Sequence, residues 1–424
     1  MTTIFALLII AISYLFISTE WINKMIAALL GGFIFIMARF LTQEEAFSYI
    51  DWNVIFLLIG MMIVVAVLKD TGIFQYMAIK TAKSAHGKPV RILILLFLVT
   101  AFVSAFLDNV TTVMMMIPMV LLLTQELKIT PIPFIINLTI ASNIGGTATL
   151  IGDPPNILIG SRAKLSFMDF VLNMTPPVLI IMLVSTALLW LFYHKRMRVS
   201  NKDRAKLMEY NERSLIVKPL LLRRSLIVVG IMLVLYISQE FLGLEAATIA
   251  MGTAMVLLLM NNRKHVEQTL THDVDWVMLL FFMGLFMLVG GLDKTGFLDV
   301  VANKIVHLGN NNPRNISLIV IWFSAVTSAI MGSVPIVATL IPTLKEVQQV
   351  MGATGGNTIW WSLALGSCLG GMGSPLGLTS NIVAIGISNR NGFRISFWGF
   401  LKYGLVYMFI SLIIASVYVV VRYF

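Results

Sequence analysis

The sequence is poor in cysteine and in charge, and both shortages exclude classes of protein. Cys368 is the single cysteine among 424 residues, so the chain cannot form an intramolecular disulfide or a cysteine-based zinc site. Only 12% of the residues are charged and 58% are hydrophobic, whereas soluble domains carry roughly 25% charged residues. A soluble protein of this length could not bury so much apolar surface. The composition predicts an all-α membrane protein that crosses the bilayer several times.

Sequence motifs of enzymes are also missing. We find no phosphate-binding Walker loop, no dinucleotide-binding fingerprint and no nucleophile motif in the sequence, which argues against an enzyme and against an ATP-driven pump. The five histidines all fall in expected loops, so a histidine metal site is not expected. We therefore predict no cofactor and no metal centre.

Positive charge is concentrated in one segment. The formal net charge is +10, and residues 194–224 contribute +7 of it. A basic segment beside membrane spans is typical of a cytoplasmic loop close to anionic lipid headgroups. We expect residues 194–224 to form a basic cytoplasmic linker, with membrane lipids and not nucleic acid as its partners.

An internal repeat divides the rest of the chain into two halves. Segment 51–72 recurs as segment 275–296, at an offset of 224 residues that a later one-residue insertion raises to 225. Repeats of this kind are typical of secondary transporters. We predict two homologous repeats, residues 1–193 and 225–424, on either side of the linker.

Each repeat contains an odd number of expected spans. We count five, of which one is interrupted by glycines and prolines, besides a re-entrant hairpin. The hairpins are expected at about 91–126 and 314–348, and the broken helices at about 132–165 and 358–389. An odd number of spans turns the second repeat upside down. The predicted fold is an all-α polytopic membrane protein of two inverted repeats of five transmembrane helices, each with a re-entrant hairpin and a discontinuous helix.

The distribution of Lys and Arg residues agrees with this topology. With both termini outside, 22 of them fall on the cytoplasmic side and 8 on the other, as the positive-inside rule requires. Residues 4–18 lack a basic leader and a cleavage site, so we interpret them as a retained span. We expect an integral protein of a prokaryotic inner membrane.

The broken segments predict the functional site. Backbone that is not helical at membrane depth costs several kcal/mol per unsatisfied group unless protein, water or a solute binds it. Close helix packing alone would also explain glycine pairs, but it does not explain Asp108 and Asp153 in apolar surroundings. A carboxylate there costs roughly 2.5–3.5 kcal/mol or more, which indicates a cation or proton site.

The candidate site residues come from both repeats. Those of the first repeat that we expect to bind substrate or ion are Asp108, Asn109, Thr111, Thr112, Ser142, Asn143, Gly145, Gly146, Thr147, Thr149, Asp153 and Asn156. Those of the second repeat are Ser333, Ser374, Thr379, Ser380 and Asn381. A coupling sodium ion would bind at Asp108, Asn109 and Asn143.

The two repeats differ in charge at matching positions. Gly332 aligns with Asp108, and Leu378 aligns with Asp153. We therefore expect the first repeat to bind the coupling proton or sodium, and the second to complete the substrate pocket through hydrogen bonds. No Lys or Arg is expected deep in this pocket, which favours a neutral or cationic solute.

Two long motifs resemble those of a known family. The runs 104–113 (SAFLDNVTTV) and 143–156 (NIGGTATLIGDPPN) resemble signatures of the ion transporter superfamily. Within it the chain is most similar to the arsenical pump membrane protein and NhaD-type antiporter group and its P protein branch. The resemblance implies a homodimer with a scaffold and a mobile part that moves by an elevator mechanism. Where the second hairpin of P-type permeases carries an acidic residue and Asn before its proline, this chain has Gly332 and Ser333.

These observations predict a secondary active transporter for a small solute, coupled to protons or sodium. Arsenite or antimonite efflux is the leading hypothesis, because the resemblance implies it. The alternatives are a sodium/proton antiporter, a dicarboxylate- or citrate-type organic anion carrier, and an ion channel. A structural membrane protein without transport activity would leave the two broken segments without a purpose.

Overall fold

The computed structural model describes residues 2–19, 21–195, 197, 199–209, 211–261, 263–351 and 357–424. Within these ranges the chain is helical and contains no strand, which confirms the predicted helical class. Arg196 and Arg198 of the predicted linker lie outside the described residues.

The first repeat ends with a long helix that leads to the linker. Its helices are α1 (Thr2–Thr19), α2 (Lys24–Met37), α3 (Gln43–Ser48), α4 (Trp52–Lys69), α5 (Ile73–Ser84), α6 (Pro89–Ser104), α7 (Asn109–Glu126), α8 (Ile132–Gly146), α9 (Pro154–Ala163) and α10 (Phe167–Tyr193). The helices α6 and α7 occupy the segment where the hairpin is expected, and α8 and α9 are the two arms of the broken helix.

The second repeat has the same order of elements. After α11 (Asn201–Glu209) and η1 (Glu212–Leu215) of the linker come α12 (Pro219–Ile237), α13 (Gln239–Leu242), α14 (Ala246–Leu259), α15 (Arg263–Gln268), the π-helical turn η2 (Thr269–Asp273), α16 (Trp276–Asp293), α17 (Phe297–Leu308), α18 (Pro313–Met331), α19 (Ser333–Met351), α20 (Thr358–Gly371), α21 (Thr379–Arg390) and α22 (Phe397–Tyr423). The helix α12 begins before the expected boundary at residue 225, because Pro219 is a favourable first helical residue.

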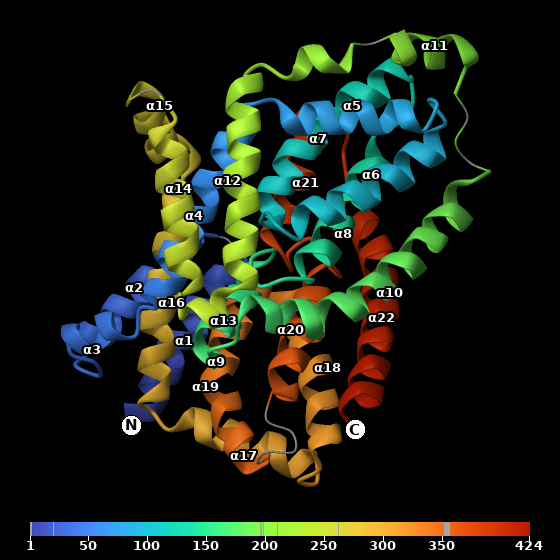
Figure 1. Ribbon diagram of the computed structural model, residues 1–424. Coiled ribbons are helices and arrows are strands. Elements are labelled where there is room, and N and C mark those ends of the chain that lie inside the picture. The colour runs from blue at the N-terminus through green and yellow to red at the C-terminus, as the bar shows by residue number, and fades with distance from the viewer. Residues whose placement is uncertain are drawn as a thin grey trace.

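The two hairpins enter the molecule from opposite ends. Figure 1 shows α5, α6 and α7 at the end where the linker helix α11 lies, and α17, α18 and α19 at the end where both termini lie. The two repeats therefore run in opposite directions through the molecule. Seven of the described helices are long and apolar enough to cross a membrane, and five shorter apolar helices accompany them.

The helices form two packed groups. One group, which we name the scaffold bundle, consists of α1, α2, α4, α12, α14 and α16, with α2 packed on α16 and α4 on α14. The other, the hairpin bundle, consists of α6 to α9 and α18 to α21, with α6 packed on α8 and α18 on α20. Matching caps start α4 and α16, where Asp51 accepts a hydrogen bond from the Val54 amide and Asp275 accepts one from the Met278 amide.

The linker is held against the hairpin-bearing end of the first repeat. The Nζ atom of Lys83 in α5 lies 2.7 Å from Oε2 of Glu212 in η1, and its hydrogen bond lowers the pKa of the Glu212 carboxyl. The Val217 amide donates to the Thr71 carbonyl over 3.1 Å. These contacts hold the start of α12 close to the end of α4.

Candidate functional site

The tip of the first hairpin meets the break between α8 and α9. Asp108 caps α7 and accepts a hydrogen bond of 2.9 Å from the Thr111 amide. The next residue, Asn109, donates from Nδ2 to Oδ1 of Asp153 over 3.2 Å. Asp153 immediately precedes α9 and is fully buried, and its Oδ2 atom has no hydrogen-bond partner among the described residues. A buried carboxylate oxygen without a partner is suited to bind a proton or a cation.

Hydroxyl side chains tie each hairpin tip to its broken helix, and one pair of these contacts matches across the repeat. Thr149 donates to the Ala105 carbonyl, and the matching Ser374 donates to the Ala329 carbonyl. Ser142 donates to the Asn109 carbonyl over 3.0 Å. A helix that stops inside the protein leaves the carbonyl groups near its C-terminus without helical partners, and Thr149 and Ser374 supply donors at the ends of α6 and α18.

Two asparagines satisfy the carbonyls at the breaks themselves. Asn156 donates from Nδ2 to the Thr149 carbonyl over 2.8 Å, and Asn381 donates from Nδ2 to the Ser374 carbonyl over 2.7 Å. The positions match across the repeat. Both asparagines are fully buried, so they stabilise the interrupted backbone and are less available to a solute.

The repeats contact each other through these asparagines. Asn143 donates from Nδ2 to Oδ1 of Asn381 over 2.8 Å, and its own Oδ1 accepts from Ser380 over 2.8 Å. Cys368, which matches Asn143, donates from Sγ to Oδ1 of Asn156 over 3.4 Å. The centre of the hairpin bundle is therefore a hydrogen-bonded junction between the two broken helices.

A cavity of about 70 Å³ lies beside this junction, between the hairpin bundle and the scaffold bundle. Residues at the N-terminal ends of four helices line it: Asn109 of α7, Asp153 before α9, Ser333 of α19 and Thr379 of α21. The scaffold bundle contributes Ile17, Lys24, Met278, Phe281 and Phe282. Each helix N-terminus carries a partial positive charge of about half a unit, so four of them face one small space.

The acidic residues compensate only two of these helix ends. Asp108 and Asp153 precede α7 and α9, whereas Gly332 and Leu378 precede α19 and α21. The backbone explains the glycine, because Gly332 has φ +92° and ψ 146°, a region open essentially to glycine alone. The end of the cavity formed by the second repeat thus keeps its positive potential.

Lys24 adds a cation that the sequence analysis did not place in the pocket. It is the first residue of α2, its Nζ donates to Oγ1 of Thr379 over 3.0 Å, and it lies 5.7 Å from the centroid of the Phe281 ring. The expectation that no Lys or Arg lies deep in the pocket did not foresee Lys24, which lines the cavity from the scaffold bundle. The sequence did contain one indication of this role. A lysine in the first turn of a helix interacts unfavourably with the helix dipole, so its presence there suggests a function other than helix stability.

The predicted site residues fall into three groups. Asn109, Asp153, Ser333 and Thr379 line the cavity. Ser142, Asn143, Thr147, Thr149, Asn156, Ser374, Ser380 and Asn381 make the hydrogen bonds of the junction and the breaks. Asp108, Thr111 and Thr112 form the first turn of α7, and Gly145 and Gly146 form close backbone contacts at the end of α8.

Two of the proposed sodium ligands already make hydrogen bonds within the protein. Asp108 caps α7, while both polar atoms of the Asn143 side chain bind Asn381 and Ser380. Among the described residues there is also no group of three or more His, Cys, Asp or Glu side chains that could hold a metal ion. Sodium binding at Asp108, Asn109 and Asn143 stays a prediction.

Known proteins resemble the chain over most of its length. A 46 kDa membrane protein of Mycobacterium leprae is 38% identical over 426 residues, which cover 99% of this chain and 99% of that protein. A protein of Mycobacterium tuberculosis described as an uncharacterized transporter is 38% identical over 427 residues. P protein of Sus scrofa is 28% identical over 501 residues, which cover 99% of this chain and 59% of P protein. The first of these relatives is thus described as a membrane protein and the second as a transporter.

A solved structure and a family pattern also match this chain. The YdaH transporter of Alcanivorax borkumensis has a similar fold, with a TM-score of 0.61 at 14% identity over 91% of this chain and 88% of YdaH. The pattern of the family described as citrate transporter matches residues 14–366. The broad superfamily expected from the motifs is thereby supported, while the arsenical pump and NhaD-type subgroup stays a prediction. This integral membrane protein belongs to the citrate transporter family.

Proposed function

We propose that the protein is a secondary active carrier of a small organic anion of the di- or tricarboxylate class, coupled to protons or sodium. The observation that carries this proposal is the cation of Lys24 beside the N-termini of α19 and α21, which no acidic residue precedes. A negatively charged solute there gains from both helix dipoles and from the ammonium group.

The other end of the same cavity supports coupling to a cation. The free Oδ2 atom of Asp153 and the amide of Asn109 offer a site where a proton or a sodium ion would offset the charge of the carboxylate. A carboxylate substrate bound close by would raise the affinity for that cation, and the cation would raise the affinity for the substrate by the same factor. This reciprocity is the basis of coupled transport.

Arsenite or antimonite efflux is the competing hypothesis. Arsenite is a neutral hydroxide near pH 7, so the charge of Lys24 would give it little advantage. Cys368, the one sulfur ligand suited to arsenic, is fully buried and hydrogen bonded to Asn156, and it is not among the cavity residues. Sodium/proton exchange would use the carboxylate end of the cavity alone, and a channel would not need a substrate end and a cation end side by side.

Flux into proteoliposomes tests the proposal. Labelled citrate, succinate and arsenite are compared under imposed proton gradients and imposed sodium gradients. We expect one of the two carboxylates to accumulate against its concentration gradient when the correct cation gradient is imposed, and arsenite not to accumulate. Accumulation of arsenite alone, sodium/proton exchange without any carboxylate, or electrical currents too fast for a carrier would each contradict the proposal.

Lys24→Gln is expected to weaken substrate binding selectively. The charge of Lys24 lies at the substrate end of the cavity, and a hydrogen bond to a charged group contributes about 1.5–3 kcal/mol, or about 10- to 100-fold in affinity. We expect KM for the carboxylate to rise by about that factor, with Lys24→Arg recovering part of it. The matched control is Lys402→Gln, at an exposed position of α22. An unchanged KM in Lys24→Gln would contradict the role of this lysine.

We also propose how the two bundles work together. In this proposal the hairpin bundle moves past the scaffold bundle as an elevator, in a homodimer whose linker faces the cytoplasm. Lys24 of the scaffold bundle and Thr379 of the hairpin bundle make a hydrogen bond between the two groups, as do Tyr14 of α1 and the Pro335 carbonyl of α19 at 3.1 Å. Such single contacts can be exchanged for others during a sliding motion.

A further inference from the structure

A second cavity lies far from the transport site, at the end of the molecule where the linker lies. It has a volume of about 390 Å³ and is formed by the first turns of α12, the end of α14 and His265 of α15. Figure 1 shows α14 and α15 beside α12, with α15 and the start of α12 at the end of the molecule where α11 lies. None of its residues takes part in the transport site described above.

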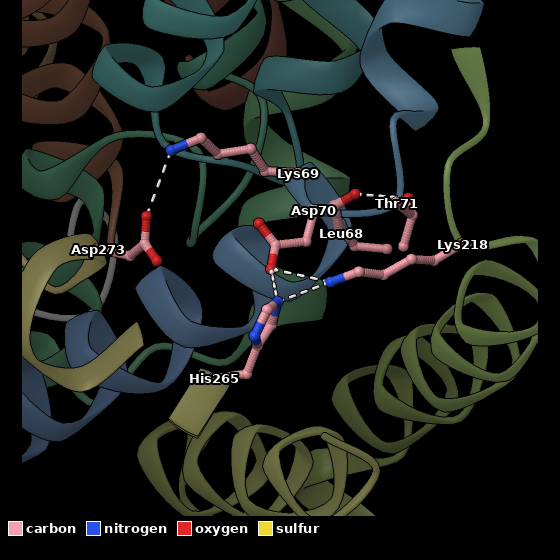
Figure 2. Close-up of polar contacts among 7 residues, drawn as sticks. All are labelled: Leu68, Lys69, Asp70, Thr71, Lys218, His265 and Asp273. Carbon is pink, nitrogen blue, oxygen red and sulfur yellow. Dashed lines mark hydrogen bonds and ion pairs between the residues drawn. The ribbon is translucent and has the colours of Figure 1, made fainter. Parts of the chain in front are cut away.

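Basic side chains line this cavity. Lys218 and Arg224 of α12 and His265 of α15 line it. Figure 2 shows Lys218 and His265 converging on Asp70, with Lys218 Nζ 3.6 Å and His265 Nε2 3.2 Å from Asp70 Oδ2, and 2.7 Å from each other. One carboxylate thus holds two nitrogen-bearing side chains in fixed positions at the rim.

Arg224 gives the cavity an excess of positive charge. It is exposed, and it makes no ion pair with any acidic side chain in the part of the chain that the structure describes. The single carboxylate nearby, Asp70, is already engaged by Lys218 and His265. A guanidinium group in this position is suited to bind a phosphate oxygen pair in bidentate fashion.

An apolar stripe on α12 lies on the same face of the helix as Arg224. Leu220, Ile227, Ile231 and Val234 are 61%, 56%, 55% and 60% exposed, and their spacing places them with Arg224 on one face of the helix. On α14, Met255, Val256 and Leu259 are 43%, 43% and 85% exposed. The two helices pack against each other, and Leu220 and Arg224 of α12 line the basic cavity together with Met260 at the end of α14.

We propose that this surface binds an anionic phospholipid, with its phosphodiester at Arg224 and Lys218 and its acyl chains along the stripe of α12. The charge of the headgroup complements the unpaired guanidinium, and the apolar stripe begins within the reach of a lipid anchored there. Basic cavities between spanning helices on the cytoplasmic side are suited to anionic headgroups. The site lies next to the contacts that join the linker to α4, so a bound lipid would stabilise that junction.

Native mass spectrometry of the full-length protein tests this inference. The protein is released from nanodiscs that contain equal amounts of phosphatidylglycerol and phosphatidylcholine, and the retained lipids are counted. We expect the wild type to retain phosphatidylglycerol preferentially, and Arg224→Gln to reduce its retention about fivefold, as expected for one basic residue near the surface. Arg224→Lys is expected to stay within twofold of the wild type.

Arg223→Gln is the matched control, since Arg223 is exposed on the same turn of α12 but does not line the cavity. Equal losses in Arg223→Gln and Arg224→Gln, or no loss in either, would overturn the proposal. Inorganic phosphate that protects against thermal unfolding as well as phosphatidylglycerol does would indicate a free-anion site instead. If Arg224→Gln disrupts a dimer without changing lipid retention, a second copy of the chain, and not a lipid, covers this surface. None of these results depends on transport activity, so they are separable from failure of the proposed function.

Discussion

Asp153→Asn is expected to lower gradient-driven uptake by at least about 30-fold, because losing one partner of a buried charge interaction costs roughly 2–5 kcal/mol. Asp153 is the fully buried carboxylate of the cavity, with one oxygen held by Asn109 and the other without a partner among the described residues. Asparagine keeps the size of the side chain and removes its charge. The measurement is the initial rate of carboxylate uptake into proteoliposomes, for the wild type and the variant at equal protein content.

The same variant distinguishes the two coupling ions. Asparagine resembles a protonated carboxyl group, so a proton-coupled carrier would still exchange labelled for unlabelled substrate in the absence of a gradient. A sodium-coupled carrier would lose this exchange as well. Glu126→Gln is the control, at the exposed end of α7, and it is expected to leave both reactions unchanged. Asp153→Asn protein that still accumulates substrate with the same proton or sodium dependence would show that the coupling site lies elsewhere.

Gly145→Ala is expected to reduce the amount of folded protein at least several-fold. A Cβ atom at Gly145 would overlap the carbonyl group of Ala101 in α6, and backbone atoms cannot move aside as a flexible side chain can. Overpacking typically costs about 1–3 kcal/mol, and losses of about 1–2 kcal/mol already change cellular abundance several-fold. The measurement is the height of the monodisperse peak in size-exclusion chromatography of the solubilised protein.

The repeat provides a second test of the same contact. Gly370 matches Gly145, and a Cβ atom there would overlap the backbone of Ala325 in α18. Gly370→Ala is therefore expected to have a similar effect. Gly386→Ala in α21 is the control, because nothing lies within 4 Å of the position of its Cβ atom. Normal yields of Gly145→Ala and Gly370→Ala would contradict the close helix packing described above.

Much of the fold could be predicted because local chemistry marks its breaks. Glycines and prolines interrupt long apolar segments in matching places, as in the stretch 145–155, and such interruptions are costly in a bilayer unless the protein uses them. The repeat then follows from the offset alone. The helix α12 starts at Pro219, before the predicted repeat boundary at residue 225, and its first turns carry the basic residues Arg223 and Arg224.

The candidate site could be predicted only in part. The sequence does not show which polar side chains form hydrogen bonds with the backbone and which stay available to a solute. Asn156 and Asn381 were expected to bind substrate or ion, but their amide groups satisfy carbonyls of the interrupted helices. Lys24 was missed for the opposite reason. It follows a span in the sequence and resembles a loop residue, and only the packing of α2 against α16 brings it to Thr379.

A cryo-electron microscopy map of the protein in lipid nanodiscs with saturating citrate or succinate tests the central claim most directly. We expect density for the carboxylate between Lys24, Ser333 and the first turn of α21, with the coupling cation or proton site at Asp153 on the other side of the cavity. Density for the anion beside Asp153 and away from Lys24, or an empty cavity under conditions that support transport, would contradict it.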